Sequence, residues 1–193
     1  MIECFFDGAA WPNPGGHGGY GMLAIDGGKG IFSEAVYIGR WPDLSNNCAE
    51  YCGAIGVLRW LIKNGVQRAL VRGDADLVIN QLNGRWRAKG GAYLPFYQEA
   101  WALRQKVPGV EFRWIPREMN DRADVLSKEA VSRRPLVVGF ALDSTVQLVA
   151  PPNLKRTKRT RDIRRELGQQ LVLAPDLDEN AIIETFKREY GAR

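Results

Sequence analysis

The sequence is poor in the residues that build zinc sites. It has one histidine, His17, and three cysteines among 193 residues. An odd number of cysteines beside a single histidine offers no structural zinc set. We therefore expect Cys4, Cys48 and Cys52 to be small core residues in a reducing compartment, and we expect a cytoplasmic protein.

Long apolar segments are missing as well. The longest uninterrupted apolar stretches, such as residues 136–142, fall far short of the ~20 residues that a membrane helix requires. The N-terminus carries Glu3 inside its first predicted strand, which is not typical of a signal peptide. With 45% apolar and 25% charged residues, the chain can bury one core and a small appendage. We expect a monomer with no membrane contact.

Positive charge is concentrated near the C-terminus. Residues 155–165 hold seven basic residues against Asp162, a local charge of +6 that leaves −1 for the remainder of a chain of formal charge +5. Such a run can follow nucleic-acid phosphates without sequence preference, or it can be a solvated linker or helix face. The candidate phosphate contacts are Lys155, Arg156, Lys158, Arg159 and Arg161.

Two aspartates stand at the ends of predicted strands. Asp7 follows an alternating strand in which Ile2, Cys4 and Phe6 share one face, so its side chain should point away from them. Asp74 ends a short apolar strand and precedes a helical pattern. This strand-to-helix edge is where open α/β sheets gather ligands.

Two further acids lie on predicted helices. Glu50 belongs to a long amphipathic helix that Asn46 or Asn47 can cap, which places it in the first turn. Asp124 lies in a helix opened by Asn120, just after a strand. Carboxylates gathered at neighbouring edges repel one another unless a cation neutralises them, so the four acids predict a divalent-metal site.

Each acid also has an ordinary structural explanation. Asp7 can be a turn residue before a glycine, and Glu50 can form a capping box with Asn47. Asp74 can cap the helix that follows it, and Asp124 can be a solvated helix acid. All four explanations would have to hold together for the metal site to be absent.

Four sequence runs resemble type 1 ribonuclease H. The resemblance covers roughly residues 1–133 and includes the order of the elements. We expect strands at 2–10, 19–26 and 30–40, a helix at 47–64, a strand at 68–73, one or two helices at 75–84 and 95–107, a strand at 110–115 and a helix at 120–133. The runs are DGAAWPNPGGHGGYG at 7–21, NNCAEYCGAI at 46–55, GDADLVINQL at 73–82 and PREMNDRADVLSKEA at 116–130.

The resemblance implies an α/β fold of the ribonuclease H type. Its mixed five-stranded sheet, with the element order βββαβαβα, is flanked by helices. We expect a catalytic domain at residues 1–134, a connector at 135–154 and a basic, helical extension at 155–193. The extension is outside the resemblance, and its two short predicted helices can dock on the core, fold as a small module or pair with another protein.

The resemblance also implies an activity. It is the hydrolysis of the RNA strand of an RNA·DNA hybrid by two Mg²⁺ ions, for which Mn²⁺ can substitute, with a 5′-phosphate and a 3′-hydroxyl as products. Asp7 would contact both ions, Asp124 the ion that activates water, and Glu50 and Asp74 the ion at the leaving oxygen. The alternative is an inactive module that binds hybrid or duplex, with the extension recruiting a partner.

Substrate contacts follow from the same resemblance. The candidates for sensing the ribose 2′-hydroxyl are Asn46, Asn47 and Glu50, with the asparagines as helix caps the alternative. The remaining candidates are Asn13 and the backbone of Gly8, Ala9 and Ala10, and a basic site of Arg85, Arg87 and Lys89 around Trp86, for which a core position is the alternative.

The sequence departs from the family pattern at three places. Asp76 adds a negative charge that would face the hybrid or the metals, and Ala10 stands where a hydroxyl residue is frequent. The loop from Trp114 to Asn120 has no histidine for proton transfer or product release, and we expect Arg117 to substitute for it in part. Activity should survive, because the metal itself lowers the pKa of its water.

Overall fold

The structure is a computed structural model, and it describes residues 1–133. The predicted connector at 135–154 and the basic extension at 155–193 lie outside the described residues, as do the candidate phosphate contacts from Lys155 to Arg161. Within residues 1–133, no helix has both the length and the apolar character needed to cross a membrane.

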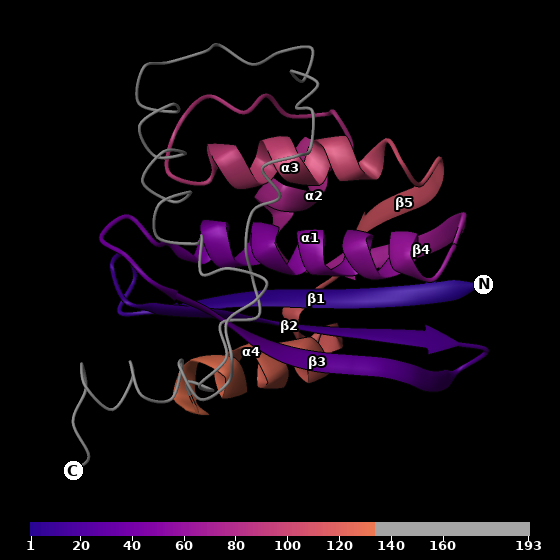
Figure 1. The fold of residues 1–193 in the computed structure, drawn as a ribbon, viewed down its shortest axis with the longest axis horizontal. Coiled ribbons are helices and arrows are strands. Elements are labelled where there is room, and N and C mark those ends of the chain that lie inside the picture. The colour runs from indigo at the N-terminus through magenta and orange to yellow at the C-terminus, as the bar shows by residue number, and fades with distance from the viewer. Residues whose placement is uncertain (134–193) are drawn as a thin grey trace, which may run out of the picture.

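One mixed five-stranded sheet organises the described chain, with the strand order β3-β2-β1-β4-β5 (Figure 1). The pairs β1–β2 and β2–β3 are antiparallel, whereas β1–β4 and β4–β5 are parallel. This topology confirms the predicted fold class. The strands are β1 (Ile2–Trp11), β2 (His17–Asp26), β3 (Lys29–Arg40), β4 (Arg68–Gly73) and β5 (Gly109–Trp114).

Helices cover both faces of the sheet. The helices at Asn46–Lys63, Asp76–Leu82 and Leu94–Arg104 lie on one face and the helix at Asp121–Arg133 on the other, as Figure 1 shows above and below the strands. Two helices lie between β4 and β5, where one or two were expected, and a short 3-10 turn at Arg117–Met119 precedes the last helix. The helices are α1 (Asn46–Lys63), α2 (Asp76–Leu82), α3 (Leu94–Arg104) and α4 (Asp121–Arg133).

The alternation of β1 sends its side chains to the two helical layers. Cys4 and Phe6 are fully buried on the α1 side, where a Cβ on Gly53 of α1 would lie 3.2 Å from the Phe6 ring. Asp7 faces the opposite way, because it pairs with Gly21 on β2 and a Cβ on Gly21 would lie 2.4 Å from Leu126 of α4. The prediction that Asp7 points away from Cys4 and Phe6 is therefore confirmed.

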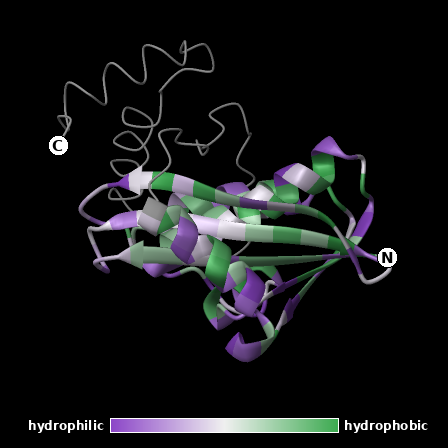
Figure 2. Ribbon diagram, turned by 90° about the horizontal axis from the view of Figure 1, so that it is seen from below, coloured by the Kyte–Doolittle hydropathy of each residue, from purple (hydrophilic) through white to green (hydrophobic). Residues whose placement is uncertain are grey.

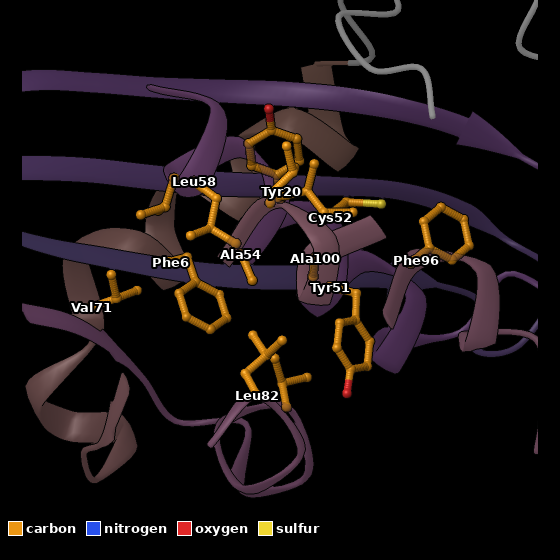
Figure 3. Close-up of a cluster of buried hydrophobic side chains, with 14 of the residues drawn as sticks. Phe6, Tyr20, Tyr51, Cys52, Ala54, Leu58, Val71, Leu82, Phe96 and Ala100 are labelled. Carbon is orange, nitrogen blue, oxygen red and sulfur yellow. The ribbon is translucent and has the colours of Figure 1, made fainter. Parts of the chain in front are cut away.

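The core lies between the sheet and helices α1 to α3. Phe6 and Val71 from the strands meet Ala54 and Leu58 from α1, with Leu82 of α2 beside them (Figure 3). Hydrophobic residues run along the strands while the loops at their ends are mostly hydrophilic (Figure 2). The cysteines are all free and buried, which confirms their assignment to the core.

The start of α1 differs from the prediction. Ser45 is the N-cap, and its hydroxyl accepts a hydrogen bond from the backbone N–H of Cys48 at 3.4 Å. The prediction that Asn46 or Asn47 caps the helix was therefore wrong. Because α1 begins at Asn46, Glu50 lies in the second turn rather than the first, and a capping box with Asn47 is excluded.

His17 is the first residue of β2, and its Nδ1 lies 2.6 Å from the Tyr37 hydroxyl. Trp86 is 46% exposed in the segment between α2 and α3, so the alternative of a core position was wrong. Its neighbours Arg85 and Arg87 are exposed too.

Candidate active site

Three of the four predicted acids meet at one end of the sheet. Asp7 comes from β1, Glu50 from α1 and Asp74 from the residue after β4, and one carboxylate oxygen from each lies within 4.8 Å of the others. Asp7 and Glu50 are buried, with 4% and 9% of their surface exposed. Hard oxygen donors at this separation can hold a divalent cation.

The fold explains why these acids converge. Parallel neighbours β1 and β4 end at the same edge of the sheet, which brings Asp7 and Asp74 together. Helix α1 then lies directly on β1, since a Cβ on Gly8 would come within 2.1 Å of the backbone nitrogen of Glu50. The absence of a side chain at Gly8 therefore allows Glu50 to reach the two aspartates.

Burial and mutual repulsion disfavour the charged forms of the acids in this cluster and raise their pKa values. Burial raises the pKa of Asp7 from 3.8 to about 6, with the Asp74 and Asp124 charges adding to the rise and the hydrogen bond from Ser127 opposing it. Burial, then the charges of Asp7 and Asp74, raises the pKa of Glu50 well above its ordinary value. A bound cation would relieve both effects.

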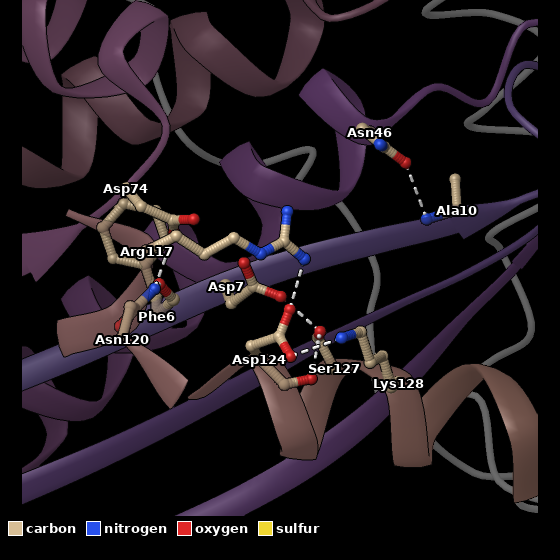
Figure 4. A network of polar contacts seen from close by, with 10 residues as sticks. All are labelled: Phe6, Asp7, Ala10, Asn46, Asp74, Arg117, Asn120, Asp124, Ser127 and Lys128. Atoms are coloured by element: carbon tan, nitrogen blue, oxygen red, sulfur yellow. Dashed lines mark hydrogen bonds and ion pairs between the residues drawn. The ribbon is translucent and has the colours of Figure 1, made fainter. Parts of the chain in front are cut away.

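Two polar side chains hold the aspartates in place (Figure 4). Asn120 uses its amide nitrogen twice, donating to the Phe6 carbonyl oxygen at 2.9 Å and to Asp74 Oδ1 at 2.7 Å. The Ser127 hydroxyl of α4 donates to Asp7 Oδ2. Each contact joins residues more than forty positions apart in the sequence, so sequence spacing offered no signal for them.

Asp124 lies beside this cluster in two ion pairs (Figure 4). Its Oδ1 is 2.5 Å from Arg117 Nη2 and its Oδ2 is 2.5 Å from Lys128 Nζ. Partial burial works to raise the pKa of Asp124, but the hydrogen bonds from Lys128 and Arg117 outweigh it and hold the pKa below its ordinary value. Asp124 is thus an ionised carboxylate already paired with cations.

The ordinary explanations for the acids do not fit this geometry. Asp7 lies within β1, not in a turn, and Ala75 rather than Asp74 is the N-cap of α2. Asp124 is only 13% exposed at its side chain, unlike a solvated helix acid. Asp76 stays out of the cluster, because its carboxylate accepts a hydrogen bond from Asn80 at 2.6 Å.

The acids fit a metal ion on a further ground. Glu50 Oε2 is buried without a hydrogen-bond partner. A buried carboxylate oxygen is costly in that state, and a cation would satisfy it. The set of donors consists of carboxylates alone, which suits Mg²⁺ or Mn²⁺ better than metals that prefer nitrogen or sulfur.

The predicted ribose-sensing residues form a small network at the start of α1. Asn46 Oδ1 accepts a hydrogen bond from Ala10 N at 2.9 Å, and Asn13 Oδ1 accepts one from Asn46 N at 3.2 Å. The Asn46 side chain is therefore engaged with β1, while Asn47 is exposed. Gly8 is buried and Ala9 half-buried along the same strand.

The basic segment at residues 85–89 is anchored by Gln81 of α2, a residue that sequence reasoning missed. Gln81 is buried, with its Oε1 accepting from the Tyr51 hydroxyl of α1 and its Nε2 donating to the Arg87 carbonyl oxygen at 3.1 Å. This connects the segment to the helix that carries Glu50. The exposed basic residues of the segment are Arg85, Arg87 and Lys89.

Comparison with known proteins agrees with this architecture. Residues 6–130 match the family model described as "Reverse transcriptase-like". The Bifunctional protein Rv2228c of Mycobacterium tuberculosis is 35% identical over 127 residues, which are 65% of this chain and 34% of that protein. Ribonuclease HI of Halobacterium salinarum is 33% identical over 131 residues, 67% of this chain and 64% of that protein. This chain thus spans about a third of the length of the mycobacterial relative.

Solved structures show the same likeness. The N-terminal RNase H domain of Rv2228c from Mycobacterium tuberculosis has a TM-score of 0.62 at 32% identity, covering 68% of this chain and 98% of that one. LC11-RNase H1, solved in complex with an RNA/DNA hybrid, has a TM-score of 0.63 at 30% identity, covering 69% and 99%. The chain therefore belongs to the reverse transcriptase-like family, and residues 1–133 have the type 1 ribonuclease H fold.

Proposed function

We propose that the protein is an endonuclease that hydrolyses the RNA strand of RNA·DNA hybrids, with a 5′-phosphate and a 3′-hydroxyl as products. The observation that carries the proposal is the convergence of Asp7, Glu50 and Asp74 within 4.8 Å, with Asp124 beside them. Relatives named as ribonucleases H share the fold, and one of them is solved with an RNA/DNA hybrid.

Asp7, Glu50, Asp74 and Asp124 would hold two Mg²⁺ ions, or Mn²⁺ in their place. Bound there, two such ions clamp the attacking and departing oxygens of an in-line displacement and lower the pKa of water. Asn120 and Ser127 would keep the Asp74 and Asp7 carboxylates in fixed orientations, as side chains behind metal ligands commonly do.

The protein's own side chains would position the hybrid. Asn47 is exposed at the start of α1, and Asn13 and Asn46 join the β1–β2 hairpin to that helix, so this surface can face the minor groove with its 2′-hydroxyls. The segment at 85–89 offers three cations and the exposed ring of Trp86 to phosphates and sugars. Charge at the segment supports binding without sequence preference.

Arg117 is placed to assist where other chains use a histidine. Its guanidinium pairs with Asp124, and its positive charge partly opposes the rise in the pKa of both Asp7 and Glu50. It stays protonated at all working pH values, so it would act by stabilising negative charge rather than by carrying a proton.

The test compares cleavage of labelled RNA·DNA hybrid, double-stranded RNA and double-stranded DNA in Mg²⁺ or Mn²⁺. We expect the hybrid alone to be cut, in its RNA strand, and Asp7→Asn to abolish the reaction while retaining the fold. Equal cutting by Asp7→Asn would remove the metal assignment. Tight hybrid binding with no cutting by the unaltered chain would favour the alternative, an inactive binding module.

A further inference from the structure

A basic groove runs along the outer edge of β5. It has a volume of about 450 Å³ and lies between the edge strand and the ends of helices α2 and α3. Its charged lining is three arginines, Arg85, Arg104 and Arg113, against one carboxylate, Glu111. The groove therefore has a local charge of +2 and attracts anions.

The side chain of Arg104 is held in place beside the groove. Its guanidinium carbon lies 5.4 Å from the centre of the Trp101 ring, which holds the side chain against α3. Its Nε is buried and has no hydrogen-bond partner. Because this Nε is buried, a ligand in the groove would meet the outer N–H groups of the guanidinium, which can donate to a phosphate oxygen.

Trp114 connects the groove with the acid cluster. It lines the groove, 47% of its surface is exposed, and its indole nitrogen donates to the backbone carbonyl of Asp74 at 3.1 Å. A nucleic-acid strand that leaves the acid cluster on this side meets an exposed aromatic ring first and the arginines next. Aromatic rings bind unpaired bases by stacking, which the paired bases of a duplex cannot offer in the same way.

The edge of β5 is poorly suited to a peptide strand. The Phe112 carbonyl oxygen on the outer side accepts a hydrogen bond from Asn83 at 2.9 Å, and the Val110 N–H is bonded to Val107 O at 3.1 Å. These contacts occupy groups that an added β-strand would need. The groove therefore favours a polyanion over a peptide partner.

We propose that this groove binds an unpaired RNA or DNA strand that extends from the hybrid, with phosphates on Arg104 and Arg113 and a base against Trp114. The inference rests on the proposed function in one respect, namely that the hybrid lies at the acid cluster. The groove would give the enzyme a preference for hybrids with single-stranded ends over blunt hybrids of equal duplex length.

The test measures binding of the full chain carrying Asp7→Asn, so that the hybrid remains uncut. The probes are one blunt hybrid and four hybrids of the same duplex length, each with a short unpaired extension at a different strand end. At least one extension should improve the dissociation constant about tenfold, in line with stacking of one base. The salt dependence should steepen by roughly 0.7 for each additional phosphate that the groove binds.

The variant that addresses the groove is Arg104→Gln with Arg113→Gln. It should lose most of the preference for the extended hybrid. It should change the affinity for the blunt hybrid less than about twofold, because a blunt hybrid has no unpaired strand to place in the groove. The preference is measured as the ratio of the two affinities, in which any effect on the acid cluster cancels. Arg113→Glu alone, at an exposed position, repeats the test without altering the packing on Trp101. Arg68→Gln with Arg122→Gln removes the same charge elsewhere and should retain the preference.

The outcomes separate the groove from the proposed function. Equal affinity for blunt and all extended hybrids, or an equal loss for both in the groove variants, would overturn the groove proposal. A preference that survives in the groove variants would overturn it too. A clear preference in the Asp7→Asn chain, with no hybrid cut by the unaltered protein, would support the groove and overturn the proposed function.

Discussion

The amide nitrogen of Asn120 donates to the carboxylate of Asp74 across 2.7 Å. The same nitrogen donates to the carbonyl oxygen of Phe6, so one side chain ties β1, the residue after β4 and the start of α4 together. Asn120 itself is only 1% exposed. The alignment of two acids from different strands thus depends on a residue that carries no charge.

Asn120→Ala should weaken metal binding and lower stability together. The change leaves the buried Phe6 carbonyl without its donor, which costs roughly 1–3 kcal/mol. Removal of a side chain behind a metal ligand typically lowers metal affinity about 10- to 100-fold. Calorimetric Mn²⁺ titration and thermal unfolding measure the two effects. Asn83→Ala, which removes an amide that donates to the Phe112 carbonyl, should lower stability but leave Mn²⁺ affinity unchanged.

The metal-free protein should lose stability as the pH rises from 4 to 7. The folded-state pKa of Asp7 is raised from 3.8 to about 6, so its protonated form favours folding below pH 3.8, and that contribution disappears as the pH passes 6. The Asp7 shift corresponds to roughly 3 kcal/mol. Glu50 acts in the same direction. Thermal unfolding in a chelator measures the effect.

Asp7→Asn provides the control for this pH dependence. In the chelator it should unfold at a higher temperature than the unaltered protein at pH 7, with little difference at pH 4. Added Mg²⁺ should stabilise the unaltered protein and not the variant. An identical pH profile in the two proteins would show that Asp7 is not a source of the instability.

Arg117→Gln should lower kcat about tenfold, equivalent to about 1.4 kcal/mol of barrier, with a decrease in stability under about 1 kcal/mol. The side chain of Arg117 is 67% exposed, so its ion pair with Asp124 adds little to folding, whereas its charge faces the acids. Lys128→Gln removes the other cation of Asp124 and should stay within about threefold of full activity. Similar decreases in both variants would assign the effect to Asp124 pairing in general.

Gln81→Met should raise KM for the hybrid several-fold at an unchanged kcat. The substitution keeps the volume of the side chain but removes the donor to the Arg87 carbonyl and the acceptor of the Tyr51 hydroxyl, so the basic segment loses its anchor. Steady-state cleavage kinetics measure both parameters. Gln98→Met, at another buried amide on α3, serves as the stability control. A fall in melting temperature at constant KM would make Gln81 purely structural.

Deletion of residues 151–193 should weaken hybrid binding and flatten its salt dependence without removing the chemistry. The deleted part contains the run of seven basic residues at 155–165, and the salt dependence of affinity becomes steeper with each phosphate that lysine and arginine neutralise. Binding at several salt concentrations measures the slope. An unchanged slope would assign the extension to something other than phosphate, such as a protein partner.

Local patterns were sufficient to place Asp7 and Asp74 at the ends of strands, whereas the order of the elements came with the resemblance to type 1 ribonuclease H. The alternation around Phe6 correctly set the face of Asp7, and Asp74 could be placed because it ends an apolar strand before a helical pattern. These predictions depend on contacts between residues close in sequence, or on the general rule that parallel strands end at one edge. That rule does not require knowledge of the side chains that meet there.

The side-chain contacts that hold the acids in place could not be predicted from local sequence patterns. Ser127 and Asp7 are 120 positions apart, and neither the hydroxyl nor its partner has a periodicity that marks the pair. The cap of α1 was misplaced for a related reason, since Ser45, Asn46 and Asn47 are all good caps in sequence, and the side chain of Asn46 accepts a hydrogen bond from distant Ala10 instead. Local propensity did not distinguish these three candidate caps, and contacts between residues far apart in the sequence did.

The bare backbone at Gly8 has a consequence for how this site can change. A methyl group there would collide with the peptide of Glu50, so the close spacing between β1 and α1 requires a residue without a side chain at position 8. Altering any single acid can remove one ligand and leave the scaffold standing, whereas adding one carbon at this glycine would separate the two halves of the pocket at once. The position tolerates no gradual adjustment.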